Sequence, residues 1–212
     1  MNRRLIHHDD TAVAEGLARV AAVVYANEIY PDAVFSTLVT RGRAMGLRLA
    51  GVVQHRAFVG GDRRCDVVLE DLATGHRTAL FENRGAGARG CLLDQAALAE
   101  ATARVEGSLE HAPQLLILNK FGKVECEGSG LRALIASAID RGIPVIIAVP
   151  KRNLDAWQSF AGEFAIELPD DANQIAVWLE RVVAASPGLQ SENENRAALM
   201  DTEIGCFMKP EQ

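Results

Sequence analysis

The fold of this chain is constrained most strongly by several short runs of consecutive apolar residues. Each run is followed by a segment with helical periodicity or by a residue that ends a helix or strand. Such runs occupy residues 20–25, 49–53, 115–119 and 145–149. A strand with one face in water alternates polar and apolar residues, whereas a continuous apolar run is typical of a strand buried on both faces. We therefore expect a mostly parallel sheet that is covered by helices on each side.

The order of the segments predicts how the sheet is connected. Residues 20–25, a helix that ends near Met45 and residues 49–53 form a βαβ unit, which joins two parallel strands through a right-handed crossover. The turn-forming residues 73–75 lie between two β-prone segments and predict an antiparallel hairpin on the sheet edge. Asp94 is the expected cap of the alanine-rich helix that follows. The predicted fold class is α/β with an inserted antiparallel hairpin. Ligands of such a sheet bind at the carboxyl ends of the parallel strands, so we expect a site among the loops 26–32, 119–130 and 150–153, the last of which begins where Pro150 ends the strand at 145–149.

Length and composition limit the domain organisation and the partners. The 212 residues suit one domain, and we expect a loose lead-in at 1–18, the α/β domain at 19–186 and a flexible tail at 187–212. The net charge of −6 argues against general nucleic-acid binding. No apolar run approaches the ~20 residues that cross a bilayer, and the N-terminus lacks the apolar stretch of a secretory signal. We expect a cytoplasmic protein without membrane contact, for which the hairpin edge offers a surface for a homodimer.

The loop after the first strand stands where a phosphate-binding loop would lie. Such a loop needs the pattern G-x-x-x-x-G-K-[ST], because its backbone N–H groups wrap the phosphates while the lysine balances their charge. Residues 26–32 contain no glycine, and the first lysine of the whole chain is Lys120. The helix terminus could still attract an anion, and an ordinary loop is the alternative reading. The candidate ligand-binding residues of this loop and the helix after it are Asn27, Glu28, Asp32 and Ser36.

The strand at 115–119 ends where a nucleoside-triphosphatase places an aspartate for Mg²⁺ and often a glutamate as base. This chain has Asn119 and Lys120 there, and a lysine can do neither task. Gly122, Lys123 and Glu125 follow and complete this group of candidate ligand-binding residues. Their structural alternative is a turn glycine beside a surface ion pair.

The stretch 115–125 resembles the hhhhDEIGKME segment of the archaeal-type nucleoside-triphosphatases of the P-loop superfamily. The chain is more similar still to a related bacterial family of uncharacterised function, which carries the phrases N-[RK]-F-G-K-x-E-x-E-G and R-G-C-x-L-D. These phrases stand here at 119–128 and 89–94, and the resemblance covers about residues 19–183. It implies a three-layer P-loop-NTPase-like fold, and some relatives are labelled with molybdenum uptake.

Residue by residue, the resemblance implies degenerate nucleotide motifs. In an alignment without gaps, Asp32 and Ala33 fall at the lysine and threonine of the P-loop. If the alignment is shifted by three residues, Phe35 and Ser36 fall there instead. Asn119 and Lys120 fall at the metal-binding aspartate and the base. The expected function is a non-hydrolytic binding or regulatory protein that holds a nucleotide, an oxyanion such as molybdate, or a partner protein. One alternative is a residual nucleoside-triphosphatase with non-consensus residues. Others are an enzyme of different activity that uses Cys91, Cys126, Glu125 and Lys123, and a purely structural or interaction protein.

The glycine-rich segment 83–90 is a second candidate for anion binding. Its three glycines let successive N–H groups point to one place, and Arg84 and Arg89 add positive charge. The alternative is a surface loop with solvated arginines. No C-x-x-C pair is present, and we expect the four cysteines to be free thiols. No cofactor or metal is predicted, except for a weak thiol site if the fold joins Cys91 to Cys126.

Overall fold

A seven-stranded sheet forms the centre of the molecule in this computed structural model, which describes residues 19–26, 29–56, 67–82 and 91–185. The strand order is β4-β3-β2-β5-β6-β1-β7. Neighbouring strands are parallel except at β3, which is antiparallel to both β2 and β4. The strands are β1 (Val20–Tyr25), β2 (Leu49–Arg56), β3 (Val67–Asp71), β4 (Arg77–Ala79), β5 (Leu115–Lys120), β6 (Val145–Pro150) and β7 (Ala165–Pro169).

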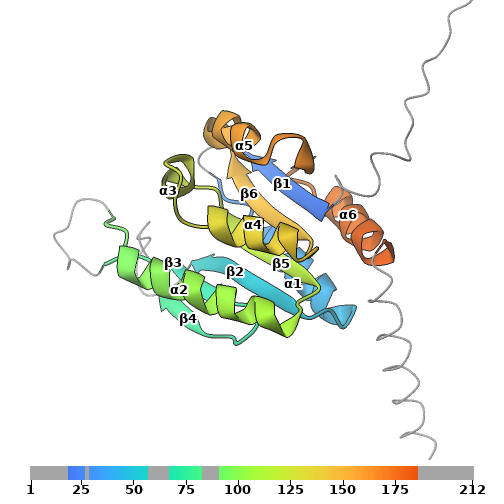
Figure 1. The fold of residues 1–212 in the computed structure, drawn as a ribbon, viewed down its shortest axis with the longest axis horizontal. Coiled ribbons are helices and arrows are strands. Elements are labelled where there is room, and N and C mark those ends of the chain that lie inside the picture. The colour runs from blue at the N-terminus through green and yellow to red at the C-terminus, as the bar shows by residue number, and fades with distance from the viewer. Residues whose placement is uncertain (1–18, 27–28, 57–66, 83–90, 186–212) are drawn as a thin grey trace, which may run out of the picture.

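Helices cover both faces of the sheet, as expected for buried parallel strands (Figure 1). On one face, residues of α2, α4 and α5 pack into a single apolar cluster with the sheet. On the other face, α1 and α6 pack against the strands and against each other. The helices are α1 (Asp32–Ala44), α2 (Gln95–Ser108), α3 (Lys123–Cys126), α4 (Arg132–Asp140), α5 (Leu154–Ala161) and α6 (Ala172–Ala184), with short 3₁₀ turns at Leu109–His111, Lys151–Asn153 and Gly162–Phe164.

Local sequence signals account for several element boundaries. The Asp94 carboxylate accepts a hydrogen bond of 2.9 Å from the N–H of Ala97 and so caps α2, as predicted. Asp71 accepts from the N–H groups of Ala73 and Thr74, which closes the β3–β4 hairpin. The structure confirms the hairpin, and β4 forms the edge of the sheet.

The pairing of β2 changes at Gly51, and this change matters for the site. Leu49, Ala50 and Gly51 pair with β5, and the last pair joins Gly51 to Ile117. From Val52 onward, β2 pairs with β3 instead. Beyond Gly51 the two strands therefore no longer share ladder hydrogen bonds.

Two features differ from the sequence prediction. Residues 123–126 form the short helix α3 where an irregular loop was expected, and β6 extends through Pro150 rather than ending before it. The predicted lead-in at 1–18 and the tail at 187–212 lie outside the described residues. Among the described helices, none is both long and apolar enough to cross a bilayer.

Candidate functional site

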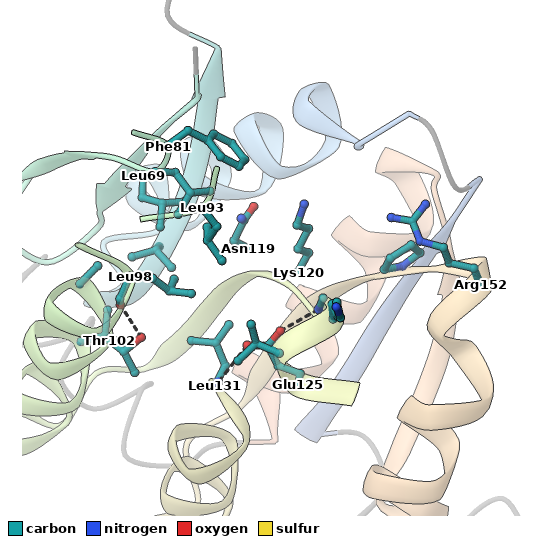
Figure 2. Close-up of a pocket in the computed structure, with 18 residues that line it drawn as sticks. Leu69, Phe81, Leu93, Leu98, Thr102, Asn119, Lys120, Glu125, Leu131 and Arg152 are labelled. Carbon is teal, nitrogen blue, oxygen red and sulfur yellow. Dashed lines mark hydrogen bonds between the residues drawn. The ribbon is translucent and has the colours of Figure 1, made fainter. Parts of the chain in front are cut away.

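A cavity of about 250 Å³ lies at the carboxyl ends of β5 and β6, beside α2 (Figure 2). It occupies the space where β2 has left β5, because Val52 and Asn119 line it just beyond the last β2–β5 pair. Its walls are mostly apolar, and its polar lining comes chiefly from the residues that follow β5 and β6. The candidate residues Asn119, Lys120, Gly122, Lys123 and Glu125 all line this cavity, so the tertiary structure brings this predicted group together.

The side chain of Asn119 is a buried polar group at the carboxyl end of β5. The residue is 6% exposed, and its Oδ1 has no hydrogen-bond partner among the described residues. Its main-chain carbonyl accepts a 3.1 Å hydrogen bond from the Tyr30 hydroxyl group. A buried polar atom without a partner is costly, so this amide is poised to bind a ligand or water that enters the cavity.

Lys120 adds a partly buried positive charge next to this amide. Burial lowers the pKa of its ammonium group, and the guanidinium of Arg152 lowers it further, while the Glu125 carboxylate acts in the opposite sense. In Figure 2, Lys120 extends from the end of β5 and Arg152 from the segment after β6, on the same side of the cavity. Two like charges near each other favour an anion between or beside them.

Glu125 closes the loop around this site and does not point its charge at a ligand. Its Oε2 accepts a 2.8 Å hydrogen bond from the N–H of Gly122, and its Oε1 accepts a 3.0 Å bond from the N–H of Leu131. The side chain is 5% exposed. Glu125 is not the acid of the surface ion pair in the structural alternative, because Lys123 pairs with the exposed Glu127 at 3.6 Å.

The loop after β1 contains the buried residue Tyr30. The Tyr30 ring stacks on Phe35 at 5.6 Å between centroids and meets Tyr25 edge-on at 5.8 Å. Burial raises the pKa of the Tyr25 hydroxyl to about 12, although Arg152 acts to lower it. Asn27 and Glu28, the other candidates from this loop, lie outside the described residues.

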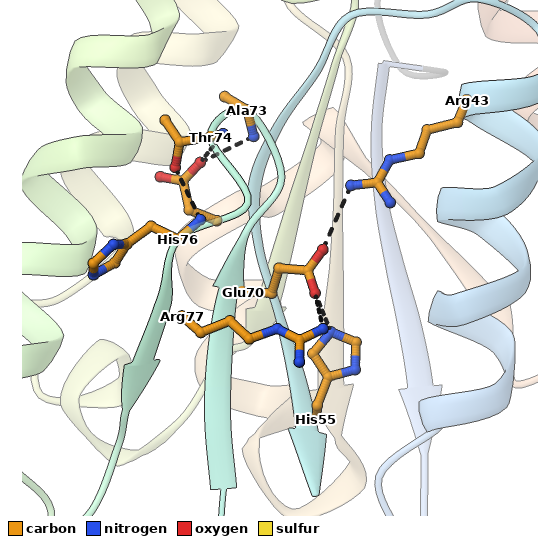
Figure 3. A network of polar contacts seen from close by, with 8 residues as sticks. Arg43, His55, Glu70, Ala73, Thr74, His76 and Arg77 are labelled. Atoms are coloured by element: carbon orange, nitrogen blue, oxygen red, sulfur yellow. Dashed lines mark hydrogen bonds and ion pairs between the residues drawn. The ribbon is translucent and has the colours of Figure 1, made fainter. Parts of the chain in front are cut away.

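Asp32 and Ser36 line a different cavity, of about 560 Å³, against β2 and β3. The main polar group there is Glu70, whose carboxylate pairs with Arg77 at 3.0 Å, His55 at 3.0 Å and Arg43 at 3.5 Å (Figure 3). Burial alone raises the pKa of Glu70, but the hydrogen bond from Arg77 and the charge of His55 outweigh it, and the pKa is lowered. Asp32 and Ser36, both in α1, therefore line a different cavity from the candidates of the β5 loop.

The remaining candidates either lie outside the described residues or are corrected. Arg84 and Arg89 belong to the segment 83–90, which the structure does not describe. Cys91 is disulfide-bonded, so the expectation of four free thiols is wrong, while Cys126 is a free thiol. A disulfide sulfur cannot act as a thiolate ligand, and no metal-binding cluster occurs among the described residues. The thiol site of Cys91 and Cys126 is therefore not formed.

Sequence reasoning missed three residues that shape the site. Tyr30 tethers β5 to the first loop, Arg152 faces Lys120, and the Asn153 side-chain amide donates a 2.7 Å hydrogen bond to the carbonyl of Phe121. Arg152 and Asn153 follow β6, a strand whose carboxyl end was recognisable from the sequence. Because ligands of such sheets bind at the carboxyl ends of parallel strands, the sequence already indicates residues 150–153 as a loop that could line a site, although neither residue was named as a ligand-binding candidate.

Comparisons with known proteins agree with this fold. A family model described as "Protein of unknown function (DUF2478)" matches residues 20–178. The chain is 34% identical over 160 residues to the Molybdenum import ATP-binding protein ModC 2 of Bradyrhizobium diazoefficiens. That alignment covers 76% of this chain but 18% of the relative, so the chain spans less than a fifth of that protein's length.

Two solved structures share the architecture at low sequence identity. THEP1 from the hyperthermophile Aquifex aeolicus has a TM-score of 0.54 at 14% identity, over 78% of this chain and 96% of that one. A human cancer-related nucleoside triphosphatase has a TM-score of 0.56 at 12% identity, over 80% and 98%. The fold is therefore the P-loop-NTPase-like α/β fold that the sequence predicts.

Proposed function

The chain belongs to the DUF2478 family, and we propose that it binds a small anionic ligand at the carboxyl ends of β5 and β6 without hydrolysing it. The observation that carries the proposal is the replacement of acidic groups by an amide and cations at this end of β5. Asn119 and Lys120 stand at the positions of the metal ligand and the base, and Arg152 adds a second cation. The ammonium group of Lys120 and the guanidinium group of Arg152 can stabilise a bound anion by charge-assisted hydrogen bonds.

The position of Glu125 supports binding without hydrolysis. It is the one acid among the described residues that line the cavity. Both of its carboxylate oxygens accept backbone hydrogen bonds, so taking a proton from water would break the contacts that close the loop. A general base must reach the proton that it abstracts, and this carboxylate is turned toward the backbone instead.

The first loop supports the same conclusion. A P-loop binds phosphates through successive free N–H groups and a lysine. Here Tyr30 is buried in its place, and no lysine precedes Lys120. Hydrolysis of nucleoside triphosphates depends mainly on electrostatic stabilisation of the transferring phosphoryl group, so losing these elements removes its main source of rate.

Titration calorimetry of the purified protein with phosphate, sulfate and molybdate tests the binding. Molybdate belongs among the probes because a relative is named as a molybdenum import protein. We expect saturable binding of at least one oxyanion, and Lys120→Gln should weaken it about tenfold through loss of a charge-assisted hydrogen bond. Arg141→Gln removes the same charge from an exposed residue after α4, at the other end of the sheet, and should leave the affinity unchanged.

Release of phosphate from ATP and GTP with Mg²⁺ tests the absence of hydrolysis. We expect no rate above background, and the double substitution Asn119→Asp with Lys120→Glu should not create activity, because the first loop still lacks its phosphate-binding groups. Robust Mg²⁺-dependent turnover by the unaltered protein would overturn the proposal in favour of a residual nucleoside-triphosphatase.

A further inference from the structure

The interior of the cavity at β5 differs chemically from its cationic side. Its walls include Val52, Leu69, Leu80, Leu98, Val105 and Leu131, which come from β2, β3, α2 and the segments beside them. In Figure 2, Leu69, Phe81, Leu93 and Leu98 gather on one side of the space, and Lys120 and Arg152 lie on the other. The site is therefore apolar in one half and cationic in the other, with Asn119 at the boundary.

The few polar groups near the apolar half are already bonded. The Thr102 hydroxyl donates a 2.9 Å hydrogen bond to the Leu98 carbonyl within α2. The Glu125 carboxylate is bonded to the loop backbone. A sugar or nucleobase placed there would lose its hydrogen bonds to water without gaining partners, which is unfavourable.

The size of the cavity also exceeds what a bare oxyanion needs. An engineered apolar cavity of about 150 Å³ holds a benzene molecule, and the cavity here has a volume of about 250 Å³. An oxyanion bound at Lys120 would leave most of the apolar half unfilled. An alkyl chain or an aromatic ring would fill it and bury apolar surface.

We infer that the ligand of this site is an amphiphilic anion, with its anionic head at Lys120 and Arg152 and its apolar body in the cavity beside α2. This inference rests on the proposed function and narrows its ligand class. Charge complementarity fixes the direction of binding, because the cations lie on one side of the space only. Asn119, whose Oδ1 has no hydrogen-bond partner among the described residues, lies between the two halves.

Calorimetric titration with inorganic phosphate and with ethyl, butyl and hexyl phosphate measures both halves of the site separately. Each added methylene should tighten binding about fourfold, the factor that corresponds to ~0.8 kcal/mol per buried methylene. Hexanol, which has the chain without the charge, should bind much more weakly than hexyl phosphate. Affinity that does not change with chain length would overturn the inference, as would tighter binding of adenosine monophosphate than of hexyl phosphate.

Two alanines of α2 give a matched pair of variants. Ala101 is buried and lines the cavity, whereas Ala103 lies on the exposed face of the same helix. Ala101→Leu fills part of the apolar half and should weaken hexyl phosphate binding at least tenfold while leaving inorganic phosphate unchanged. Ala103→Leu should change neither affinity. If Ala101→Leu does not fold, the series of alkyl phosphates on the unaltered protein still tests whether the apolar half binds the chain of the ligand.

The outcomes separate this inference from the proposed function. Binding of inorganic phosphate that depends on Lys120 but gains nothing from a chain supports the proposed function and overturns the amphiphilic ligand. Equal binding of hexanol and hexyl phosphate, unaffected by Lys120→Gln, overturns both, because the anion would then play no part.

Discussion

The hydroxyl group of Tyr30 donates a 3.1 Å hydrogen bond to the main-chain carbonyl oxygen of Asn119. This contact joins the loop after β1 to the end of β5, the two places where P-loop proteins hold phosphates and the metal-binding aspartate. Both residues are buried, and the Tyr30 ring also packs on Tyr25 and Phe35. The aromatic cluster of Tyr25, Tyr30 and Phe35 is thereby held against the end of β5.

Tyr30→Phe should lower the free energy of unfolding by about 1–2 kcal/mol, because the carbonyl of Asn119 loses a buried donor. Tyr25→Phe is the matched control, because the Tyr25 hydroxyl makes no hydrogen bond within the part of the chain that the structure describes. This variant should lose less unfolding free energy than Tyr30→Phe. Urea denaturation of the three proteins measures both values. Equal losses for the two variants would show that the Tyr30 hydroxyl contributes nothing specific.

Glu125→Gln should lower the free energy of unfolding by roughly 2–3 kcal/mol. The substitution places an NH₂ group opposite one of the two backbone N–H donors, at Gly122 or Leu131. Glu127→Gln removes only an exposed ion pair with Lys123 and should cost less than about 0.5 kcal/mol. Chemical denaturation distinguishes the two, and a Glu125→Gln variant as stable as Glu127→Gln would contradict a closing role for Glu125.

Gly130→Ala should destabilise the loop after α3 more than Gly75→Ala destabilises the hairpin turn. Both glycines have positive φ, +63° and +74°, so each substitution costs about 1–2 kcal/mol in backbone strain. A Cβ at Gly130 would also collide with the Glu125 carboxylate, whereas open space surrounds Gly75. Thermal unfolding gives the comparison, and a smaller effect at Gly130 would be evidence against the tight Glu125 contact.

Acid should weaken the fold partly through Glu70. Its cationic partners hold the folded pKa below the ordinary value of 4.5, so the folded state favours the carboxylate over the protonated form. This stability is present above pH 4.5 and is lost as the pH falls through the lower, folded pKa. The difference in unfolding free energy between the unaltered protein and Glu70→Gln should therefore shrink below pH 4.5.

Urea titrations above and below that pH measure this difference. Glu180→Gln is the control, because Glu180 pairs with Arg41 at 2.8 Å but both side chains are about half exposed. Solvent screens such a pair, so its removal should show little dependence on pH. A difference for Glu70→Gln that stays constant with pH would contradict the ionised Glu70 network.

Much of the fold could be predicted from sequence because its signals are local. A continuous apolar run specifies a strand buried on both faces, and Asp94 caps the helix that follows it. Trp157 and Trp178 also lie in the core, 1% and 3% exposed, as their helical spacing indicates. The resemblance that places Asn119 and Lys120 at the positions of acidic residues was visible in the chain, because motif positions are compared by their spacing along it.

The tertiary structure alone decided which of these residues meet. The cavity lies beside the point where β2 exchanges β5 for β3, after Gly51, and no local pattern predicts a change of partner between strands distant in sequence. The same holds for Glu125, which appears as a surface charge in sequence but accepts hydrogen bonds from N–H groups three residues before it and six after it. Strand pairing and burial depend on the whole packed sheet, so they determine which groups a side chain contacts. The sequence by itself determines only the chemistry of that side chain, such as its charge and its capacity to form hydrogen bonds.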